Sequence, residues 1–282
     1  MKRIELADFP RWSPWPGRLM NLTPWSIPTR TVDKVDREYD KDKYAACLAF
    51  LEGKASGASA EDVKRFEFGE SGDAPICVSV GDELYETTLL DARRRYYDLL
   101  TTTLGPLIEK SRSVVELGAG YGYNLWMLKQ RFADKTFFGG EYSENATKVA
   151  ARLYGTNSGI TVKRFNFYDA QTYEFLRDLP APVVVYTAHA IEQIPHIGPL
   201  FDSLVRFRDR IEAVVHFEPL HEEPGTHLLQ MLRHRYTEAN DYNRDLLSEL
   251  RSRSYVKLTS LEENVYGLNP LNPSSVFSWK FS

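Results

Sequence analysis

A carboxylate and three glycines lie close together in sequence in the segment VVELGAGYGYNLWML, residues 114–128. Glu116 ends an apolar run, and glycines follow at positions 118, 120 and 122. Glycines after a strand let the backbone approach a ligand closely, and the N-terminus of the next helix points free N–H groups at it. A carboxylate at this turn would repel a phosphate and favours a ligand with positive charge, such as an ammonium group. Glu141, 21 positions after Gly120, is placed to bind the hydroxyls of a ribose.

A second group of reactive side chains lies further along the chain, where all 6 histidines fall between positions 189 and 234. An alcohol hydroxyl is a poor nucleophile, and a positioned base accelerates its reactions about 10²–10⁴-fold. His189, Glu218 and His221 are the candidates for such a base, because each lies at or just after the end of an apolar run expected to be a strand. His216 lies inside such a run, so we expect it to be a core residue.

The segment HFEPLHEE also allows a metal site formed by His216, Glu218 and His221. Hard cations prefer several carboxylates to histidine, so a divalent ion is possible but not favoured. The two cysteines, Cys47 and Cys77, do not have the spacing of metal ligands. The expectation is therefore a site without metal.

Aromatic and amide side chains in RHRYTEANDYNRD, residues 233–245, suit a ligand with many hydroxyl groups. Ring faces can cover its C–H surfaces while amides bind its hydroxyls. We expect five residues to contact an acceptor of this kind: Glu192, Tyr236, Asn240, Tyr242 and Asn243. The alternative is a cap helix that is stabilised by polar contacts and binds nothing.

The elements that must position these side chains alternate between strand and helix. Apolar runs predict buried strands at 113–117, 136–142, 160–167, 182–188 and 212–219, with helical segments between them. This alternation predicts a parallel sheet covered on both faces. Two further strands, 255–261 and 274–281, have no helix between them and predict an antiparallel pair at the C-terminus, and 226–253 predicts a long helical insert.

The N-terminal third has a different pattern. Residues 1–30, with Trp12, Trp15 and Trp25 among prolines, predict an irregular arm that could act as a lid. Residues 31–53 predict a helix with a solvated charged face, 52–62 a loop, 74–90 a hairpin turning at Gly81-Asp82, and 91–110 a helix. We therefore divide the chain into an N-terminal arm and cap region, residues 1–94, and a ligand-binding domain, residues 95–282, with its insert at 224–253.

Four segments in this order resemble the motifs of class I S-adenosylmethionine-dependent methyltransferases: VVELGAGYG, FFGGEYS, RFNFYDA and VVYTAHAIEQI. The resemblance covers roughly residues 95–282. It implies a Rossmann-like α/β fold with a seven-stranded, mostly parallel sheet and an antiparallel C-terminal strand. It also implies S-adenosylmethionine as methyl donor and a cofactor site formed by Glu116, Gly118, Ala119, Gly120, Tyr121, Glu141, Tyr142, Asn166, Phe167 and Thr187.

Within this resemblance, Glu141 would bind the ribose, and Asn166 with Phe167 would contact the adenine. Aspartate is the commoner adenine ligand, so Asn166 departs from the pattern, although an amide oxygen can still accept from the exocyclic amine. The segments NDYNRDLL and NPLNPSS resemble methyltransferases found with polysaccharide or glycoside biosynthesis.

Composition narrows the possible partners. The chain has 282 residues, 43% of them hydrophobic, and a formal net charge of −4, which gives no general attraction to nucleic acid. No apolar stretch is long enough for a membrane span, and neither a signal peptide nor a disulfide framework is expected. We expect a cytoplasmic monomer or homodimer that acts on a small molecule or saccharide.

The leading hypothesis is an O-methyltransferase that transfers a methyl group to a hydroxyl of a sugar or glycoside. The alternatives are a methyltransferase for another secondary metabolite or a peptide, a nicotinamide-dependent dehydrogenase, and a cofactor-binding protein without turnover.

Overall fold

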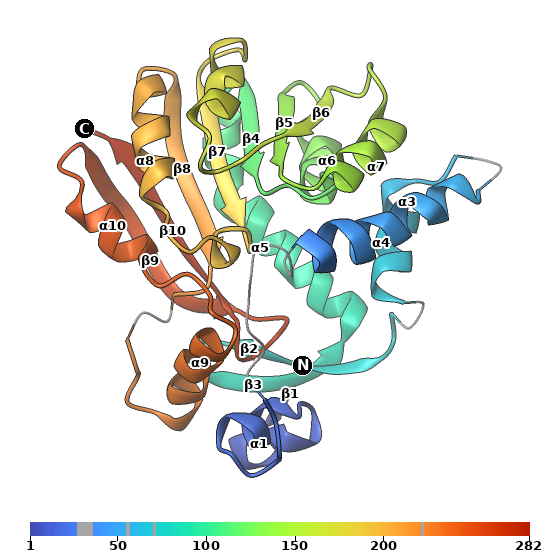
Figure 1. Ribbon diagram of the computed structural model, residues 1–282, viewed down its shortest axis with the longest axis vertical. Helices are drawn as coiled ribbons and strands as arrows, with labels where there is room; N and C mark the ends of the chain where they lie inside the picture. The colour runs from blue at the N-terminus through green and yellow to red at the C-terminus, as the bar shows by residue number, and fades with distance from the viewer. Residues whose placement is uncertain (27–35, 55–56, 70–71, 221–222) are drawn as a thin grey trace.

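The structure, a computed structural model, describes residues 1–26, 36–54, 57–69, 72–220 and 223–282. Its centre is a seven-stranded sheet with the strand order β6-β5-β4-β7-β8-β10-β9 (Figure 1). The strands are β4 Ser113–Leu117, β5 Thr136–Glu141, β6 Ile160–Arg164, β7 Val183–Ala188, β8 Ile211–Glu218, β9 Val256–Tyr266 and β10 Ser274–Phe281. The first five pair in parallel, and β10 is antiparallel to both β8 and β9. The predicted sheet, with its antiparallel C-terminal strand, is confirmed.

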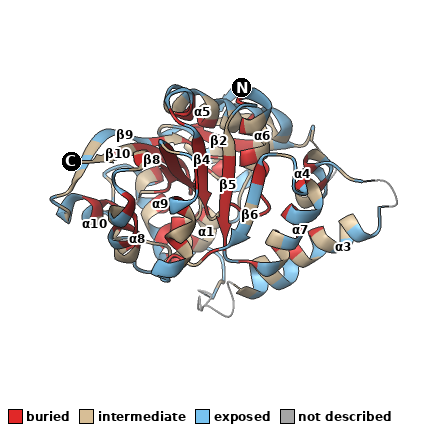
Figure 2. Ribbon diagram, turned by 90° about the horizontal axis from the view of Figure 1, so that it is seen from above, coloured by how far each residue is buried: buried red, intermediate tan, exposed pale blue. Residues whose placement is uncertain are grey.

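Helices cover both faces of the sheet because successive strand residues point to opposite sides. In β4, Val114 packs with α5, α6 and α7, whereas Val115 packs with η3, α8 and α10. Figure 2 shows that the buried residues concentrate in the strands between these two layers. The helices are α5 Leu89–Lys110, α6 Tyr123–Arg131, α7 Glu144–Tyr154, η3 Ala170–Arg177, α8 Gly198–Leu204 and α10 Leu246–Ser252.

Strand β6 ends earlier than the sequence predicts, at Arg164 rather than Phe167. The side-chain oxygen of Asn166 accepts a hydrogen bond from the Tyr168 backbone N–H at 3.0 Å. This local bond is the asparagine turn that competes with a sheet ladder. Asn166 and Phe167 therefore lie in a turn beyond the strand.

A second, antiparallel sheet of three strands has the order β1-β3-β2. Its strands are β1 Lys2–Ile4, β2 Pro75–Val80 and β3 Glu83–Thr88. Val80 pairs with Glu83, so the predicted hairpin at Gly81-Asp82 is confirmed, whereas β1 was not predicted. A bridge between Ser79 and Gly267 connects this sheet to the end of β9.

The segment between the arm and the hairpin is more helical than its composition predicts. It contains the π-helix η2 Arg37–Tyr44, α3 Ala45–Glu52 and α4 Ala60–Phe68. The end of the predicted loop 52–62 is the first turn of α4, because Ser59 and Asp62 form a reciprocal capping box. The N-terminal part of the predicted helix 31–53 lies outside the described residues.

The described part of the tryptophan-rich arm, residues 1–26, contributes no side chain to the ligand cavity at the carboxyl edge of the central sheet. Its elements η1 Leu6–Arg11 and α1 Trp15–Leu19 lie at one end of the molecule, beside the small sheet and α9 Leu228–Ala239 (Figure 1). The Trp15 ring contacts Trp25 and Tyr236 edge-on, with centroids 5.0 and 4.7 Å away. Residues 1–26 therefore pack on the insert and not at the cavity, where a lid was expected. Within the described ranges, no helix is both long and apolar enough to cross a membrane.

Candidate active site

A cavity of about 870 Å³ opens at the carboxyl ends of β4, β5 and β7. Open α/β sheets bind their ligands at this edge, and the volume lies within the range of small-molecule sites. Its walls come from η2, α4 and α5 on one side and from the loop after β9 on another. Nine of the ten predicted cofactor residues line it: Glu116, Gly118, Ala119, Gly120, Tyr121, Glu141, Tyr142, Asn166 and Phe167.

The glycine turn after β4 needs two residues without side chains. Gly118 and Gly120 have φ angles of +81° and +55°, which glycine adopts without strain. A Cβ at Gly118 would lie 2.2 Å from the Cβ of Ala190, in the turn after β7. A Cβ at Gly120 would lie 2.6 Å from the hydroxyl of Tyr44. The turn is therefore enclosed between η2 and the turn after β7.

Glu141, at the tip of β5, is held by two backbone donors. Its Oε2 accepts from the Gly120 N–H and its Oε1 from the Ser143 N–H, both at 2.7 Å. Burial raises the pKa of Glu141, although these hydrogen bonds oppose the shift. The carboxylate is thus fixed beside the glycine turn, where a ribose hydroxyl can donate to it.

Glu116, at the tip of β4, is 1% exposed and has an incomplete set of partners. Its Oε1 accepts from Asn124 Nδ2 at 2.6 Å. Its Oε2 is buried and makes no hydrogen bond of normal geometry within the part of the chain that the structure describes. The Tyr186 hydroxyl favours the ionised form of this carboxyl, but its effect on the pKa of Glu116 is smaller than that of burial. Burial raises the pKa of Glu116 to about 8. A cationic group in the cavity would satisfy this oxygen and favour the ionised carboxylate.

Aromatic side chains form the part of the cavity beyond Glu141. Phe167 is buried edge-on against Phe165, with centroids 5.0 Å apart. Tyr142 is 47% exposed, and the guanidinium of Arg164 lies 5.0 Å from its ring centroid. The side-chain oxygen of Asn166 already accepts from Tyr168, so its amide N–H groups are the part available to a ligand.

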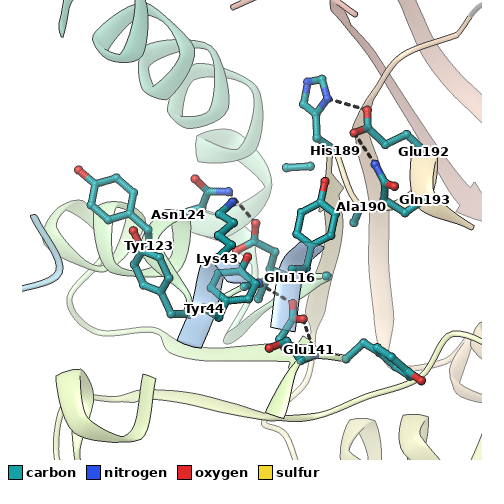
Figure 3. A pocket seen from close by; sticks show the side chains of 18 of the residues that line it. Lys43, Tyr44, Glu116, Tyr123, Asn124, Glu141, His189, Ala190, Glu192 and Gln193 are labelled. Atoms are coloured by element: carbon teal, nitrogen blue, oxygen red, sulfur yellow. Dashed lines mark hydrogen bonds and ion pairs between the residues drawn. The ribbon is translucent and has the colours of Figure 1, made fainter. Parts of the chain in front are cut away.

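His189 and Glu192 form a hydrogen-bonded pair in the same cavity (Figure 3). His189 Nδ1 lies 3.0 Å from Glu192 Oε2, and His189 Nε2 lies 2.7 Å from Ser274 Oγ. Glu192 is held in turn by Asn272 and Gln193, at 2.8 and 2.9 Å. Burial opposes the charged imidazolium, but the charge and hydrogen bond of Glu192 outweigh it, so the pKa of His189 lies above its usual value.

The backbone of His189 is in the left-handed region, with φ +52°. A residue other than glycine is uncommon there, and such positions concentrate at functional sites. The His189 N–H donates to Phe217 O at 3.0 Å, which fixes this conformation.

Glu218, a candidate base from the sequence, is buried beneath the turn after β7 and is not among the residues that line the cavity. It accepts hydrogen bonds from the backbone N–H groups of Ala190 at 3.0 Å and of Glu192 at 3.4 Å. Burial raises the pKa of Glu218 to about 7. The side chain therefore braces the turn that presents His189.

Thr187 was expected at the cofactor, but it is fully buried and faces the interior. Its hydroxyl lies 2.8 Å from His216 Nδ1, and Trp279 Nε1 donates to His216 Nε2 at 2.9 Å. Burial lowers the pKa of His216 to about 3. His216 is thus the core residue that its apolar surroundings predict, and neither of its nitrogens is available to a metal. His221 lies outside the described residues, and among those described no three potential ligands gather at one point.

Of the five residues expected to contact an acceptor, Glu192 lines the cavity and four do not. Tyr236 packs against Trp15, and its backbone oxygen accepts from Asn240 Nδ2 at 2.8 Å. Tyr242 packs beside Tyr236, with centroids 6.1 Å apart. Asn243 caps α10 by accepting from Leu246 N at 3.0 Å. These polar groups stabilise the ends of the insert helices, which agrees with the alternative prediction of a cap helix held by polar contacts.

Several lining residues had no sequence signal that pointed to a ligand: Lys43, Tyr44, Lys64, Glu67, Arg93, Tyr96 and Asn124. The charged face of η2 was interpreted as solvated, which is wrong for Asp40 and Lys43. The capping box at Ser59 could have revealed α4, but not that this helix faces the glycine turn.

No protein-family model matches the chain, and no curated protein matches it in sequence. Among solved structures, one similar chain is a SAM-dependent methyltransferase from Anabaena variabilis. The two share 12% identity and a TM-score of 0.50, over 92% of this chain and 99% of that one. Another is StiE O-MT residues 942–1257, with 14% identity and a TM-score of 0.47 over 69% of this chain and 75% of that one.

A third similar structure is the plantazolicin methyltransferase BpumL, in complex with a pentazolic desmethylPZN analogue and SAH. It shares 10% identity and a TM-score of 0.42, over 66% of this chain and 83% of that one. The strand order, with its antiparallel β10, and the match over nearly the full length of the Anabaena variabilis protein establish the architecture. This chain has the fold of the class I S-adenosylmethionine-dependent methyltransferases.

Proposed function

We propose that the protein is an enzyme that transfers a methyl group from S-adenosylmethionine to a hydroxyl of a sugar or glycoside. The observation that carries this proposal is that the histidine–carboxylate pair lies in the same cavity as the glycine turn and its two carboxylates. We call Glu116, Gly118, Gly120, Glu141 and Phe167 the cofactor end, and His189, Glu192, Asn272 and Ser274 the acceptor end.

The cofactor end fits this donor on three counts. Glu141 is held as an acceptor for ribose hydroxyls. The buried Oε2 of Glu116 is available to an ammonium group, and Phe167 offers an aromatic surface to a base. When bound, the donor supplies an activated methyl carbon; the residues of the chain position the two reactants and move the proton.

The acceptor end supports proton removal from a hydroxyl. With its Nδ1–H donated to Glu192, neutral His189 presents a lone pair at Nε2. The Ser274 hydroxyl lies 2.7 Å from this nitrogen, so a hydroxyl fits there. We propose that Nε2 takes the acceptor proton as the oxygen attacks the methyl carbon, and that Glu192 stabilises the imidazolium formed.

A polyhydroxylated acceptor is supported by the groups around His189. Asn269, Asn272 and Gln193 bring amides to the cavity, and the Tyr96 ring lies 6.4 Å from the His189 ring. The Asn272 Oδ1 atom is buried and accepts no hydrogen bond from any residue that the structure describes. An acceptor hydroxyl could donate to it, which an apolar metabolite could not do.

The first test compares ligands by thermal shift. S-adenosylhomocysteine should raise the melting temperature and NAD should not; the reverse result would favour a dehydrogenase. Labelled methyl transfer from S-adenosylmethionine to a panel of saccharides, peptides and phenols then tests the acceptor. Transfer to peptides or phenols alone would contradict the sugar assignment, and binding without transfer to any acceptor would favour a protein without turnover.

A further inference from the structure

His189 Nε2, the nitrogen that would take the acceptor proton, already has a hydroxyl partner in the protein. It lies 2.7 Å from Ser274 Oγ, and Ser274 is fully buried at the start of β10. The pairing of β10 with β9 shifts between Ser274 and Val276, an irregularity of the kind that re-aims a side chain beside an active site. A neutral imidazole has one accepting nitrogen, so an acceptor hydroxyl could use Nε2 directly only if Ser274 left it.

The state of Glu192 decides which way these hydrogen bonds run. Burial opposes ionisation of Glu192, but the charge of His189 and hydrogen bonds from three side chains outweigh it, so the pKa of this carboxyl lies below its usual value. An ionised carboxylate only accepts, so Nδ1 carries the proton of the neutral imidazole and Nε2 its lone pair. The Ser274 hydroxyl therefore donates to Nε2, and its oxygen can accept a second proton donor.

Tyr96, on α5, supplies this second donor. It lines the cavity, as Ser274 does, and its ring lies 6.4 Å from the His189 ring. The Tyr96 hydroxyl forms a hydrogen bond with Ser274. Three proton-carrying groups therefore follow one another, from Tyr96 through Ser274 to His189.

The Tyr96 hydroxyl is suited to pass a proton on and not to keep it. Burial raises the pKa of Tyr96, and the carboxyls of Glu116, Glu218 and Glu192 raise it further. The hydrogen bond with Ser274 opposes this shift but is the smaller effect. The phenol therefore stays protonated, and a neutral hydroxyl can donate one proton while it accepts another. Because Glu116 acts on it from the cofactor end and Glu192 from the acceptor end, this hydroxyl lies where the two reactants must meet.

We propose that Tyr96 and Ser274 form a proton relay from the acceptor to His189, so that Tyr96 contacts the acceptor hydroxyl and Nε2 is the final proton acceptor. This inference rests on the proposed function. As the acceptor oxygen forms its bond to the methyl carbon and the carbon–sulfur bond breaks, the acceptor proton moves to Tyr96 Oη. The Tyr96 proton moves to Ser274 Oγ, and the Ser274 proton moves to Nε2. Each hydroxyl gives up one proton and receives one, so only the imidazole gains a charge, which Glu192 stabilises.

The test uses two substitutions of nearly the same shape in the middle of the relay. Ser274→Thr keeps a hydroxyl, Ser274→Val replaces it with a methyl group, and both branched side chains suit a strand. Ser275→Ala is the matched control, because Ser275 is equally buried and its hydroxyl accepts from the Asn264 N–H at 3.0 Å. Tyr96→Phe, on a different element, removes only the first hydroxyl. Turnover is measured at saturating S-adenosylmethionine, with the acceptor found in the panel.

If the relay operates, Ser274→Val and Tyr96→Phe should each lower turnover about 10²–10³-fold, within the range for loss of a positioned base. Ser274→Thr should turn over at least about tenfold faster than Ser274→Val, because it restores the hydroxyl. Ser275→Ala should keep the turnover of the wild type. Tyr96→Phe or Ser274→Val combined with His189→Asn should add little to the loss caused by His189→Asn alone, because the three residues act as one unit.

A second readout does not depend on turnover. Nitrogen NMR of the free protein, with labelled histidine, reports whether the lone pair of His189 Nε2 accepts a hydrogen bond. Ser274→Val should move the Nε2 resonance of the neutral imidazole toward that of a nitrogen without a donor, whereas Ser274→Thr should leave it near the wild-type position.

The relay is overturned if the wild type transfers methyl groups and Tyr96→Phe turns over as fast as the wild type, or Ser274→Val as fast as Ser274→Thr. The acceptor would then meet Nε2 directly. A wild type that transfers no methyl group to any acceptor overturns the proposed function and the relay with it. The two failures are thus distinguished by the wild type alone, before any variant is compared.

Discussion

At the cofactor end, Glu116 and Glu141 lie at the tips of β4 and β5, and the turn after β4, which contains Gly118, donates a hydrogen bond to Glu141 through the Gly120 N–H. At the acceptor end, His189 is held by Glu192, Ser274 and, through Glu218, by the end of β8. In the first site, Glu116 and Glu141 accept hydrogen bonds from partners at most 21 positions away, whereas His189 in the second site is held by a partner 85 positions away. Substitutions at the cofactor end should therefore act on binding, and those at the acceptor end on turnover and on the stability of the turn after β7.

The largest effect is expected for His189→Asn, because asparagine tolerates the left-handed backbone but removes the base. Turnover at saturating cofactor, with the saccharide found in the panel, should fall about 10²–10⁴-fold, while the affinity for S-adenosylhomocysteine changes less than about twofold. His196→Gln is the matched control, because His196 is 84% exposed. If cofactor affinity falls by the same factor as turnover, the acceptor end and the cofactor end do not act separately.

Glu218→Gln tests the brace beneath the turn. In the wild type, burial raises the pKa of Glu218 to about 7, above the usual 4.5 of a glutamate. Its contribution to folding is therefore complete below pH 4.5 and is lost as the pH rises through 7, a change of about 3 kcal/mol in the free energy of unfolding. Denaturant titrations between pH 4.5 and 8 should show the wild type losing stability relative to Glu218→Gln by roughly this amount. Parallel curves for the two proteins would contradict the buried, protonated state.

Glu141→Gln should weaken the binding of S-adenosylhomocysteine by about 10–100-fold, because the hydrogen bonds to a charged acceptor are lost. Turnover at saturating cofactor should change far less, which is the opposite of the result expected for His189. Glu144→Gln, on the exposed start of α7 and paired with Lys148, is the control. If the variant and the wild type bind S-adenosylhomocysteine with equal affinity, Glu141 does not contact the cofactor.

The smallest effect, at most about tenfold for one pH unit, is a pH dependence of cofactor binding. Burial raises the pKa of Glu116 to about 8, so the carboxyl is protonated at pH 6 and must ionise to accept an ammonium group. Calorimetry in the wild type should show the affinity for S-adenosylhomocysteine increasing by up to about tenfold per pH unit between pH 6 and 8. In Glu116→Gln the affinity should be lower and nearly constant over this range. A wild-type affinity independent of pH would mean that Glu116 does not meet the ammonium group.

The same contrast explains how far the sequence could predict the molecule. The parallel sheet, the antiparallel β10 and the nine predicted cofactor residues that line the cavity follow from local signals, such as apolar runs and glycines at strand ends. Asn240 and Asn243 do not line the cavity, and the sequence could not tell this because an amide at a helix end looks the same whether it caps the helix or binds a ligand. Arg93 was not found because a charged residue on a helix is usually exposed, whereas here the rings of Phe68 in α4 and Tyr123 in α6 lie against its guanidinium and the residue is buried.

The division at residue 94 stays a prediction, but the cavity has walls from both sides of it. Lys43, Lys64 and Arg93 precede that position, and they face Glu116 and Tyr123, which follow it. A shorter protein beginning at residue 95 would keep the whole central sheet and lose this wall.

One carboxylate joins the N-terminal segment to the cofactor end. Asp40, in η2, accepts from Ser143 Oγ at 2.5 Å and from the Asn145 N–H at 2.9 Å, at the start of α7. The Ser143 N–H also donates to Glu141, and Tyr44 of η2 lies over Gly120. The folding of η2 and the binding of a ligand at the glycine turn are thus thermodynamically linked. We expect a ligand that immobilises Glu141 also to protect residues 37–44 from proteases and to slow the exchange of their amide hydrogens.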